Sequence, residues 1–212
     1  LIRALSRASS VGDSLSEHSI LMEFLRLVEL DSTIFNLPDC GHIIQRSVLR
    51  KTGNFTSVEA LRAWADAYIE RHADHLSNDH KQIIRFAVCE NQESLSPDRD
   101  AYIATLVGFL NDEPGVYCEC VIRQRLGYLL NTRGRSHDAL VHLQRAVELA
   151  PLCGLDGDIA FVLVQMGYAH FYLRNIAKAI DVGAKALRVA KPYPGTFWHR
   201  NSLFALAEFL DL

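Results

Sequence analysis

The sequence lacks the loops with which proteins hold nucleotides or present a nucleophile. Neither G-x-G-x-x-G nor G-x-x-x-x-G-K-[ST] occurs in the 212 residues, and the G-x-S-x-G elbow is missing too. Phosphate loops need those glycines because backbone N–H groups must approach the phosphate closely, and the elbow exposes the serine of α/β-hydrolases. We therefore expect a chain that is not an enzyme and that carries no cofactor.

The chain also lacks a large excess of charge of either sign. The chain has 22 basic and 25 acidic residues, which are interspersed, and its formal net charge is -3. Nucleic-acid binding depends on a basic stripe that neutralises phosphates, so we expect no direct nucleic-acid contact from this segment. Hydrophobic residues make up 49% of the chain, which is enough to bury a core.

No cysteine framework and no membrane segment are visible. The five cysteines are odd in number and irregular in spacing, which indicates a reducing compartment and a cytoplasmic location. The most apolar stretch, 159–173, is too short to span a bilayer and predicts a buried helix. The chain shows no signal peptide, begins at Leu1 and ends inside a helical pattern, so we interpret it as a fragment of a longer protein.

A histidine-rich stretch offers the one candidate metal site. His72, His75 and His80 stand with two aspartates within nine residues. The spacing matches no standard zinc pattern, and Asn78-Asp79 indicates a helix break followed by a new cap. We expect solvated histidines at a helix junction and no metal. A helical metal-dependent enzyme that uses this cluster remains the alternative from the enzyme class.

Two segments forty residues apart align without gaps. The first holds Leu126-Gly127-Tyr128, Gly134-Arg135, Ala139, Leu143, Ala146, Leu149 and Pro151; the second holds Met166-Gly167-Tyr168, Arg174-Asn175, Ala179, Gly183, Ala186, Val189 and Pro192. Antiparallel helices pack closely where a small residue on one faces a small residue on the other. Gly127 is expected to face Ala139 and Ala146, and Gly167 to face Ala179 and Ala186, with a left-handed Gly134 ending the first helix.

The same forty-residue shift extends the pattern in both directions. It reaches Ala207 on a third first-helix and, more weakly, turns near residues 94 and 53, where Ala60 and Ala67 stand seven apart. We predict an all-α stack of antiparallel hairpins in one domain, 1–212. Within it, 1–117 are divergent hairpins opened by a helix over 14–30, 118–192 are two clear repeats, and 196–212 are the first helix of a truncated repeat or a cap.

These residues resemble the tetratricopeptide repeat family, whose marks are the small–aromatic pair Gly127-Tyr128, the pair Ala139 and Ala146, and the terminal Pro151. The resemblance implies a right-handed superhelix. The forty-residue period is similar to the sensor repeats of maltose-regulator-type bacterial transcription activators, and also to repeats in peptide-pheromone receptors and kinesin light chains. It implies a binding module, either a regulatory or sensor segment of a transcription regulator or a peptide-binding adaptor.

First helices would line a concave face that binds a protein, a peptide or a small effector. The residues expected there are Gln124, Tyr128 and Asn131, then Val164, Tyr168, Phe171 and Tyr172, then Asn201, Phe204 and Glu208. Tyr128 and Tyr168 could instead only pack between repeats. Family members that hold acidic chaperone tails use lysine and asparagine where this chain has Gln124 and Tyr128, so we do not expect that ligand.

The last helix carries a further expectation. Phe204, Leu206, Phe209 and Leu210 would stand on a helix without a partner, where they would expose apolar surface. This predicts a homodimer formed through the C-terminal helix.

Overall fold

The computed structural model describes residues 57–93, 98–153 and 156–211, together with Glu23, Phe24, Arg26, Leu27 and Gln45. Eight α-helices and one 3₁₀ helix have their bounds in these residues, which contain no strand. The all-α prediction is confirmed. The predicted turn at residue 53 and most of the predicted helix over 14–30 lie outside the described residues.

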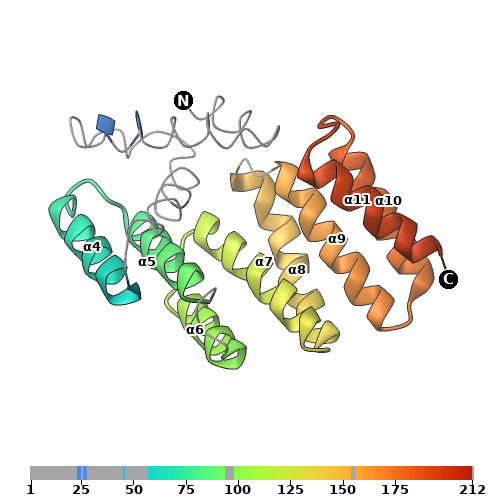
Figure 1. Cartoon of the computed structure of the whole chain (residues 1–212), viewed down its shortest axis with the longest axis horizontal. Helices are drawn as coiled ribbons and strands as arrows, with labels where there is room; N and C mark the ends of the chain where they lie inside the picture. Colours follow the sequence, from blue (N-terminus) through green and yellow to red (C-terminus); the bar gives the residue numbers. More distant parts are fainter. Residues whose placement is uncertain are drawn as a thin grey trace. The chain divides into compact units, whose positions relative to one another are not determined.

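The chain divides into two compact units between Cys118 and Glu119. This division falls one residue from the start of the two clear repeats. The first unit holds α4 (Val58–Arg71), α5 (Asn78–Glu93) and α6 (Arg99–Asn111). The second holds most of α7 (Val116–Thr132), then α8 (Ser136–Leu149), the 3₁₀ helix η3 (Ala150–Cys153), α9 (Asp156–Tyr172), α10 (Ile176–Ala190) and α11 (Phe197–Leu210) (Figure 1).

In the first unit, serine side chains start two successive helices. Ser57 Oγ accepts a hydrogen bond from the Ala60 backbone N–H (3.2 Å) at the start of α4, and Ser77 Oγ accepts one from the His80 N–H (3.1 Å) at the start of α5. Such caps satisfy backbone donors that have no partner inside the helix. The predicted break therefore exists, but Ser77 caps the new helix, and Asn78 is already its first residue.

The buried face of α4 differs from the predicted one. Ala60 and Ala67 are exposed, whereas Leu61 and Ala65 lie in the core. Because neighbouring positions on a helix point in different directions, a shift of one residue moves the small residues out of the packing face. The repeat pattern therefore does not describe this helix. Elsewhere in the unit, α5 packs against both α4 and α6, with the Phe86 and Phe109 rings edge to face at 6.3 Å.

In the second unit, α7 ends as the sequence predicts. Gly134 has a φ of 73°, in the left-handed region that glycine adopts without strain. The Gly134 N–H donates to the Asn131 carbonyl oxygen (3.0 Å) and the Arg135 N–H to the Leu130 carbonyl oxygen (2.9 Å). This pair of bonds is the Schellman motif, which turns the chain back into α8.

The turn after α9 has the same geometry forty residues later. Arg174 has a φ of 62°, its N–H donates to the Phe171 carbonyl oxygen (2.9 Å), and the Asn175 N–H donates to the His170 carbonyl oxygen (2.8 Å). The two hairpins therefore share one turn, although only the first has glycine at the left-handed position.

The first hairpin packs through its small residues. A Cβ added to Gly127 would lie 2.3 Å from Leu143 Cγ, so the glycine is needed for the leucine to fit. Ala139 and Ala146, one turn on either side of Leu143, are fully buried, but the three atoms nearest to that Cβ position all belong to Leu143, so the prediction that Gly127 faces the two alanines was incomplete. The Cys120 thiol lies 3.6 Å from the Ala146 carbonyl oxygen, near the other end of the hairpin, which shows that α7 and α8 are antiparallel.

The second hairpin uses its glycines differently. A Cβ on Gly167 would lie 2.6 Å from Cε2 of Phe209, and one on Gly183 would lie 3.1 Å from Cδ2 of the same ring. Phe209, from α11, thus enters the space between α9 and α10. Ala179 and Ala186 are buried beside it, but the two atoms nearest to that Cβ position on Gly167 belong to Phe209, and the Ala179 backbone oxygen follows at 3.6 Å. The prediction that Gly167 chiefly faces the two alanines was therefore incomplete.

Helix α9 forms the centre of the second unit. It packs against α8, α10, α11 and η3. Ala160, Val162, Val164 and Ala169 are fully buried, which confirms the buried helix predicted over 159–173. Among the helices of the described ranges, none is long and apolar enough to cross a membrane.

Candidate functional site

Exposed aromatic side chains occur on α7, α9 and α11 of the second unit. Tyr128 on α7 is 36% exposed, Tyr172 on α9 is 55% exposed and Phe204 on α11 is 67% exposed. Tyr168 and Glu208 adjoin them. We call these five residues the aromatic face. Large aromatics at a surface favour partner binding because they combine apolar area with few rotatable bonds.

Tyr168 links α9 to α11. Its hydroxyl donates a hydrogen bond to Oε2 of Glu208 (2.7 Å), and its ring stacks on that of Tyr172 with centroids 6.0 Å apart. Burial raises the pKa of the Tyr168 phenol, and the bond to Glu208 raises it further. The hydroxyl therefore stays protonated and holds the Glu208 carboxylate in place at the surface.

Tyr128 and Tyr172 belong to the same surface. Burial raises the pKa of the Tyr172 phenol first, and the nearby Glu208 and Tyr128 raise it further, so the three side chains are close enough to interact electrostatically. The guanidinium of Arg125 lies 5.8 Å from the centroid of the Tyr128 ring, within the range of a cation–π interaction. The face therefore combines aromatic area with a carboxylate at one end and a guanidinium at the other.

Two residues predicted for the concave face lie inside the protein. Val164 is fully buried in the core of the second unit, and Asn131 is 5% exposed. Asn131 Nδ2 donates to the Gln165 backbone oxygen (2.8 Å), which ties α7 to α9. Both predictions are wrong. Asn131 is covered where α7 meets α9, and Val164 is covered by a core cluster that holds Ala179 and Ala186 of α10 and Ala205 and Phe209 of α11.

Three other residues predicted for the concave face are only partly exposed. Gln124, Phe171 and Asn201 are half-buried. The Phe171 ring packs against Phe209 (centroids 5.5 Å apart) and against Tyr172 (6.1 Å). Phe171 thus supports the exposed Tyr172 ring, and all three side chains offer a partner only part of their area. Tyr168 likewise packs between helices, whereas Tyr128, Tyr172 and Phe204 are available for contact.

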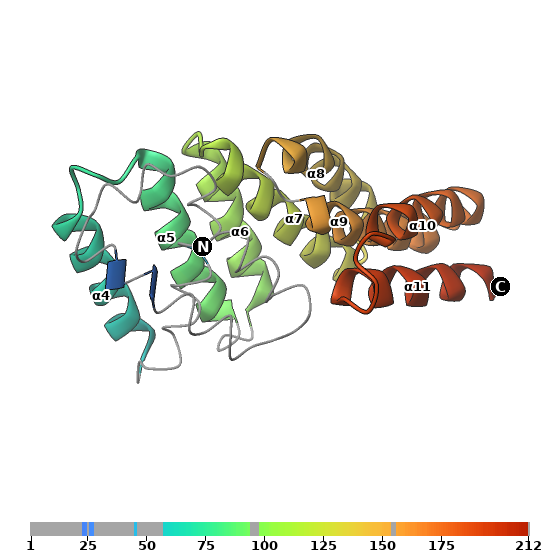
Figure 2. The ribbon, with the colours of Figure 1, turned by 90° about the horizontal axis from the view of Figure 1, so that it is seen from above.

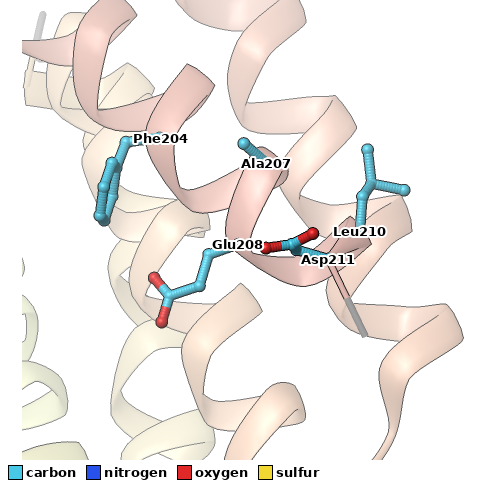
Figure 3. Close-up of a pocket in the computed structure, with 5 residues that line it drawn as sticks. All are labelled: Phe204, Ala207, Glu208, Leu210 and Asp211. Carbon is cyan, nitrogen blue, oxygen red and sulfur yellow. The ribbon is translucent and has the colours of Figure 1, made fainter.

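A surface hollow of about 580 Å³ lies along α11 (Figure 3). Its lining residues are Phe204, Ala207, Glu208, Leu210 and Asp211. In Figure 3, Phe204 and Glu208 point to the same side of the helix and Leu210 points to the other. One rim of the hollow therefore belongs to the aromatic face, and the other rim is a separate apolar surface.

The candidate metal ligands are not brought together. His72 is buried with its ring 4.6 Å from that of Tyr68, His75 is exposed, and His80 is half-buried. Burial lowers the pKa of His80, and the adjacent Asp79 opposes that shift. The end of α4, a turn and the start of α5 spread the histidines over different environments. Over the part of the chain that the structure describes, no group of three or more histidine, cysteine or acidic residues could hold a metal ion.

Two contributors to this region were missed in the sequence. Leu203 is 46% exposed on α11, and Phe209, predicted to be exposed, is 1% exposed. The signal for Phe209 was the loss of side-chain volume at Gly183, which stands where the first repeat has Leu143. The signal for Leu203 was its seven-residue spacing from Leu210, which places both on one side of a helix.

No protein-family model, curated protein or solved structure matches this chain. Its function therefore has to be inferred from its own residues.

Proposed function

We propose that this chain is a protein-binding helical-repeat module whose aromatic face holds a segment of a partner protein. In this proposal the hairpins α7–α8 and α9–α10, followed by α11, form a right-handed superhelical stack of tetratricopeptide type. Three observations support it: the identical turns forty residues apart, the bond from Asn131 to α9, and the bond from Tyr168 to α11. The last two link α7 to α9 and α9 to α11.

The exposure of Tyr128, Tyr172 and Phe204 is the observation that carries the proposal. Such rings release water when an apolar side chain covers them, and they lose little conformational entropy. The exposed carboxylate of Glu208, at one end of the aromatic face, attracts a cation. The partner segment that fits therefore has apolar side chains interspersed with lysine or arginine.

An open face fits a peptide or a helix better than a small effector. Small-molecule sites usually enclose most of the ligand, whereas the hollow beside Phe204 has all its described lining residues on one helix and its C-cap. We propose that the chain is the regulatory or sensor segment of a larger transcription regulator, and the alternative is a peptide-binding adaptor. Cys89, Cys118, Cys120 and Cys153 are buried as thiols and not as disulfides, which is compatible with the cytoplasmic location that we propose.

Selection from a library of displayed peptides tests the proposal. We expect enrichment of sequences that mix apolar and basic residues, and affinity about tenfold lower for Tyr128→Ala, Tyr172→Ala or Phe204→Ala. Val141→Ala is the matched control, because Val141 is 67% exposed on the second helix α8. Enrichment of acidic peptides, or equal losses in the control and the three variants, would contradict the proposed site.

A further inference from the structure

The side of α11 away from the core carries its own apolar surface. Leu203 is 46% exposed, Leu210 is 60% exposed, and Ala207 between them is exposed as well. Steps of four and three residues place these side chains on one side of the helix. We call Leu203, Ala207 and Leu210 the outer face of α11; on the opposite side, Ala205 and Phe209 are buried in a cluster with residues of α9 and α10. Figure 2 shows the ribbon of α11 alongside that of α10.

The forty-residue repeat shows what such a face can accept. Ala207 occupies the position of Gly127 and Gly167. At each of those two glycines a large side chain from another helix fits onto the small residue, Leu143 in one case and Phe209 in the other. Ala207 is the small residue of its own helix, and it is exposed. A small residue at the centre of a helix face lets a second helix approach closely.

We propose that the outer face of α11 binds the outer face of a second copy of this chain, with the two α11 helices antiparallel around a twofold axis. A twofold interface must be complementary to itself, because the same surface of each copy is used and every contact between two different residues therefore occurs twice. Leu203 and Leu210 stand four residues before and three residues after Ala207. In an antiparallel pair each Leu203 meets the other copy's Leu210, and the two Ala207 residues lie at the crossing.

The charges at the two ends favour the same arrangement. Arg200 is exposed in the first turn of α11, and Asp211 is exposed at its C-cap. When Leu203 of one copy lies opposite Leu210 of the other, each Arg200 lies about two residues along the helix axis from the point opposite the other copy's Asp211. This offset is roughly 3 Å. An arginine side chain spans that offset, so two ion pairs form. A parallel pair would place the two Arg200 side chains together, and the two Asp211 side chains together, and would be repelled.

The interface is small, which sets the expected strength. Three apolar side chains per copy on one helix bury less area than a standard stable interface, so we expect a dissociation constant on the order of 10–100 µM. The dimer should therefore depend on concentration. The outer face shares no residue with the aromatic face, although Phe204 and Glu208 line the same hollow as Ala207 and Leu210. Tyr128 and Tyr172 lie outside both this hollow and the outer face, so their variants test the peptide site separately.

Sedimentation velocity of the whole chain, from about 1 to 300 µM, tests the proposal. The expected result is a shift from one chain to two over this range, and its loss in Leu203→Glu and Leu210→Glu. Val141→Glu is the control, since Val141 is 67% exposed on α8 and should leave the shift unchanged. All these side chains are exposed, and circular dichroism checks that each variant is folded. A wild-type protein that stays monomeric over the whole range would overturn the proposal.

A charge exchange tests the antiparallel pairing. Arg200→Asp alone and Asp211→Arg alone should each weaken the dimer by about tenfold, whereas the double variant should regain most of the affinity. Both replacements also suit the helix dipole, so neither is expected to destabilise α11. Single losses without recovery in the double variant would overturn the antiparallel arrangement.

Discussion

The two hairpins of the second unit have the same backbone turn, but the large side chain that packs onto the glycine of the first helix comes from a different element in each. In α7–α8, Leu143 from the hairpin's own second helix packs onto Gly127. In α9–α10, the residue at that position is Gly183, and Phe209 from α11 fills the space over Gly167. The first hairpin thus completes this contact by itself, whereas the second needs the following helix. The repeat determines where a small residue is required, and the large residue that covers it can come from another element.

Removal of Phe209 is expected to have the largest effect. Its ring is 1% exposed and lies against Gly167, Gly183 and the ring of Tyr168, 5.1 Å away. Phe209→Ala should lower the free energy of unfolding by about 3–5 kcal/mol, because it removes a buried aromatic ring and leaves a cavity. Urea unfolding measures the loss. Phe204→Ala on the same helix is the control, and because Phe204 is 67% exposed it should cost less than about 0.5 kcal/mol.

Rebuilding the first hairpin's contact in the second sharpens the comparison. Gly183→Leu alone should destabilise, since its added Cβ already lies 3.1 Å from the Phe209 ring. Combined with Phe209→Ala, the new leucine has the freed space, as Leu143 has over Gly127. The double variant should therefore be more stable than the sum of the two single losses predicts, by about 1 kcal/mol or more. Strict additivity would show that the two fillings are not equivalent.

Overpacking the first hairpin is the second largest expected effect. Gly127→Ala places a Cβ 2.3 Å from Cγ of the fully buried Leu143, so the helices must separate or the leucine must move. We expect a loss of about 1–3 kcal/mol by thermal or urea unfolding. In a Leu143→Ala background the same substitution should cost much less. An equal cost in both backgrounds would mean that Leu143 is not the obstacle.

The shared turns allow a smaller exchange. Gly134 (φ 73°) and Arg174 (φ 62°) occupy equivalent left-handed positions, and only glycine adopts this conformation without strain. Gly134→Arg should lower the free energy of unfolding by about 1 kcal/mol, and Arg174→Gly should leave it unchanged or raise it by up to about 1 kcal/mol. Effects of the same sign at the two positions would show that the turns are not equivalent.

Features set by local chemistry could be predicted from the sequence. The left-handed turn at Gly134, its counterpart at Arg174 and the buried alanines Ala139 and Ala179 follow from spacing within one hairpin. The exposed aromatics Tyr128, Tyr172 and Phe204 were also identified, because residues facing away from a hairpin partner can be read from helical geometry.

Features set by contacts between hairpins could not be predicted in this way. Asn131 bonds to α9 of the following hairpin, and Val164 lies in a core cluster to which α11 contributes Ala205 and Phe209. Phe209 was expected at the surface, because the space that it fills is formed by Gly167 and Gly183 on two other helices. The sequence of its own helix does not reveal that space. The spacing of residues inside one repeat does not show which helix of another repeat covers the side chains that its own hairpin leaves exposed.

The smallest expected effect is a pH dependence that differs between the hairpins. His142 on α8 is half-buried, with Nδ1 3.4 Å from the Arg123 guanidinium, and its counterpart on α10 is Val182. Burial, followed by Arg123, lowers the pKa of His142 below its usual 6.5. The unfolded chain therefore binds the proton more readily, so stability falls as the pH is lowered through the range of about 7 to 5.

Exchanging these two side chains tests whether the pH dependence belongs to the position. Urea midpoints at pH 5, 6 and 7 should show a smaller decline for His142→Val than for the wild type. Some decline should remain, because burial and Lys178 lower the pKa of His170 in the second hairpin. The reciprocal Val182→His places a histidine at a position that is 8% exposed and should steepen the decline. An unchanged slope in His142→Val would mean that this imidazole gains its proton equally well in the folded protein.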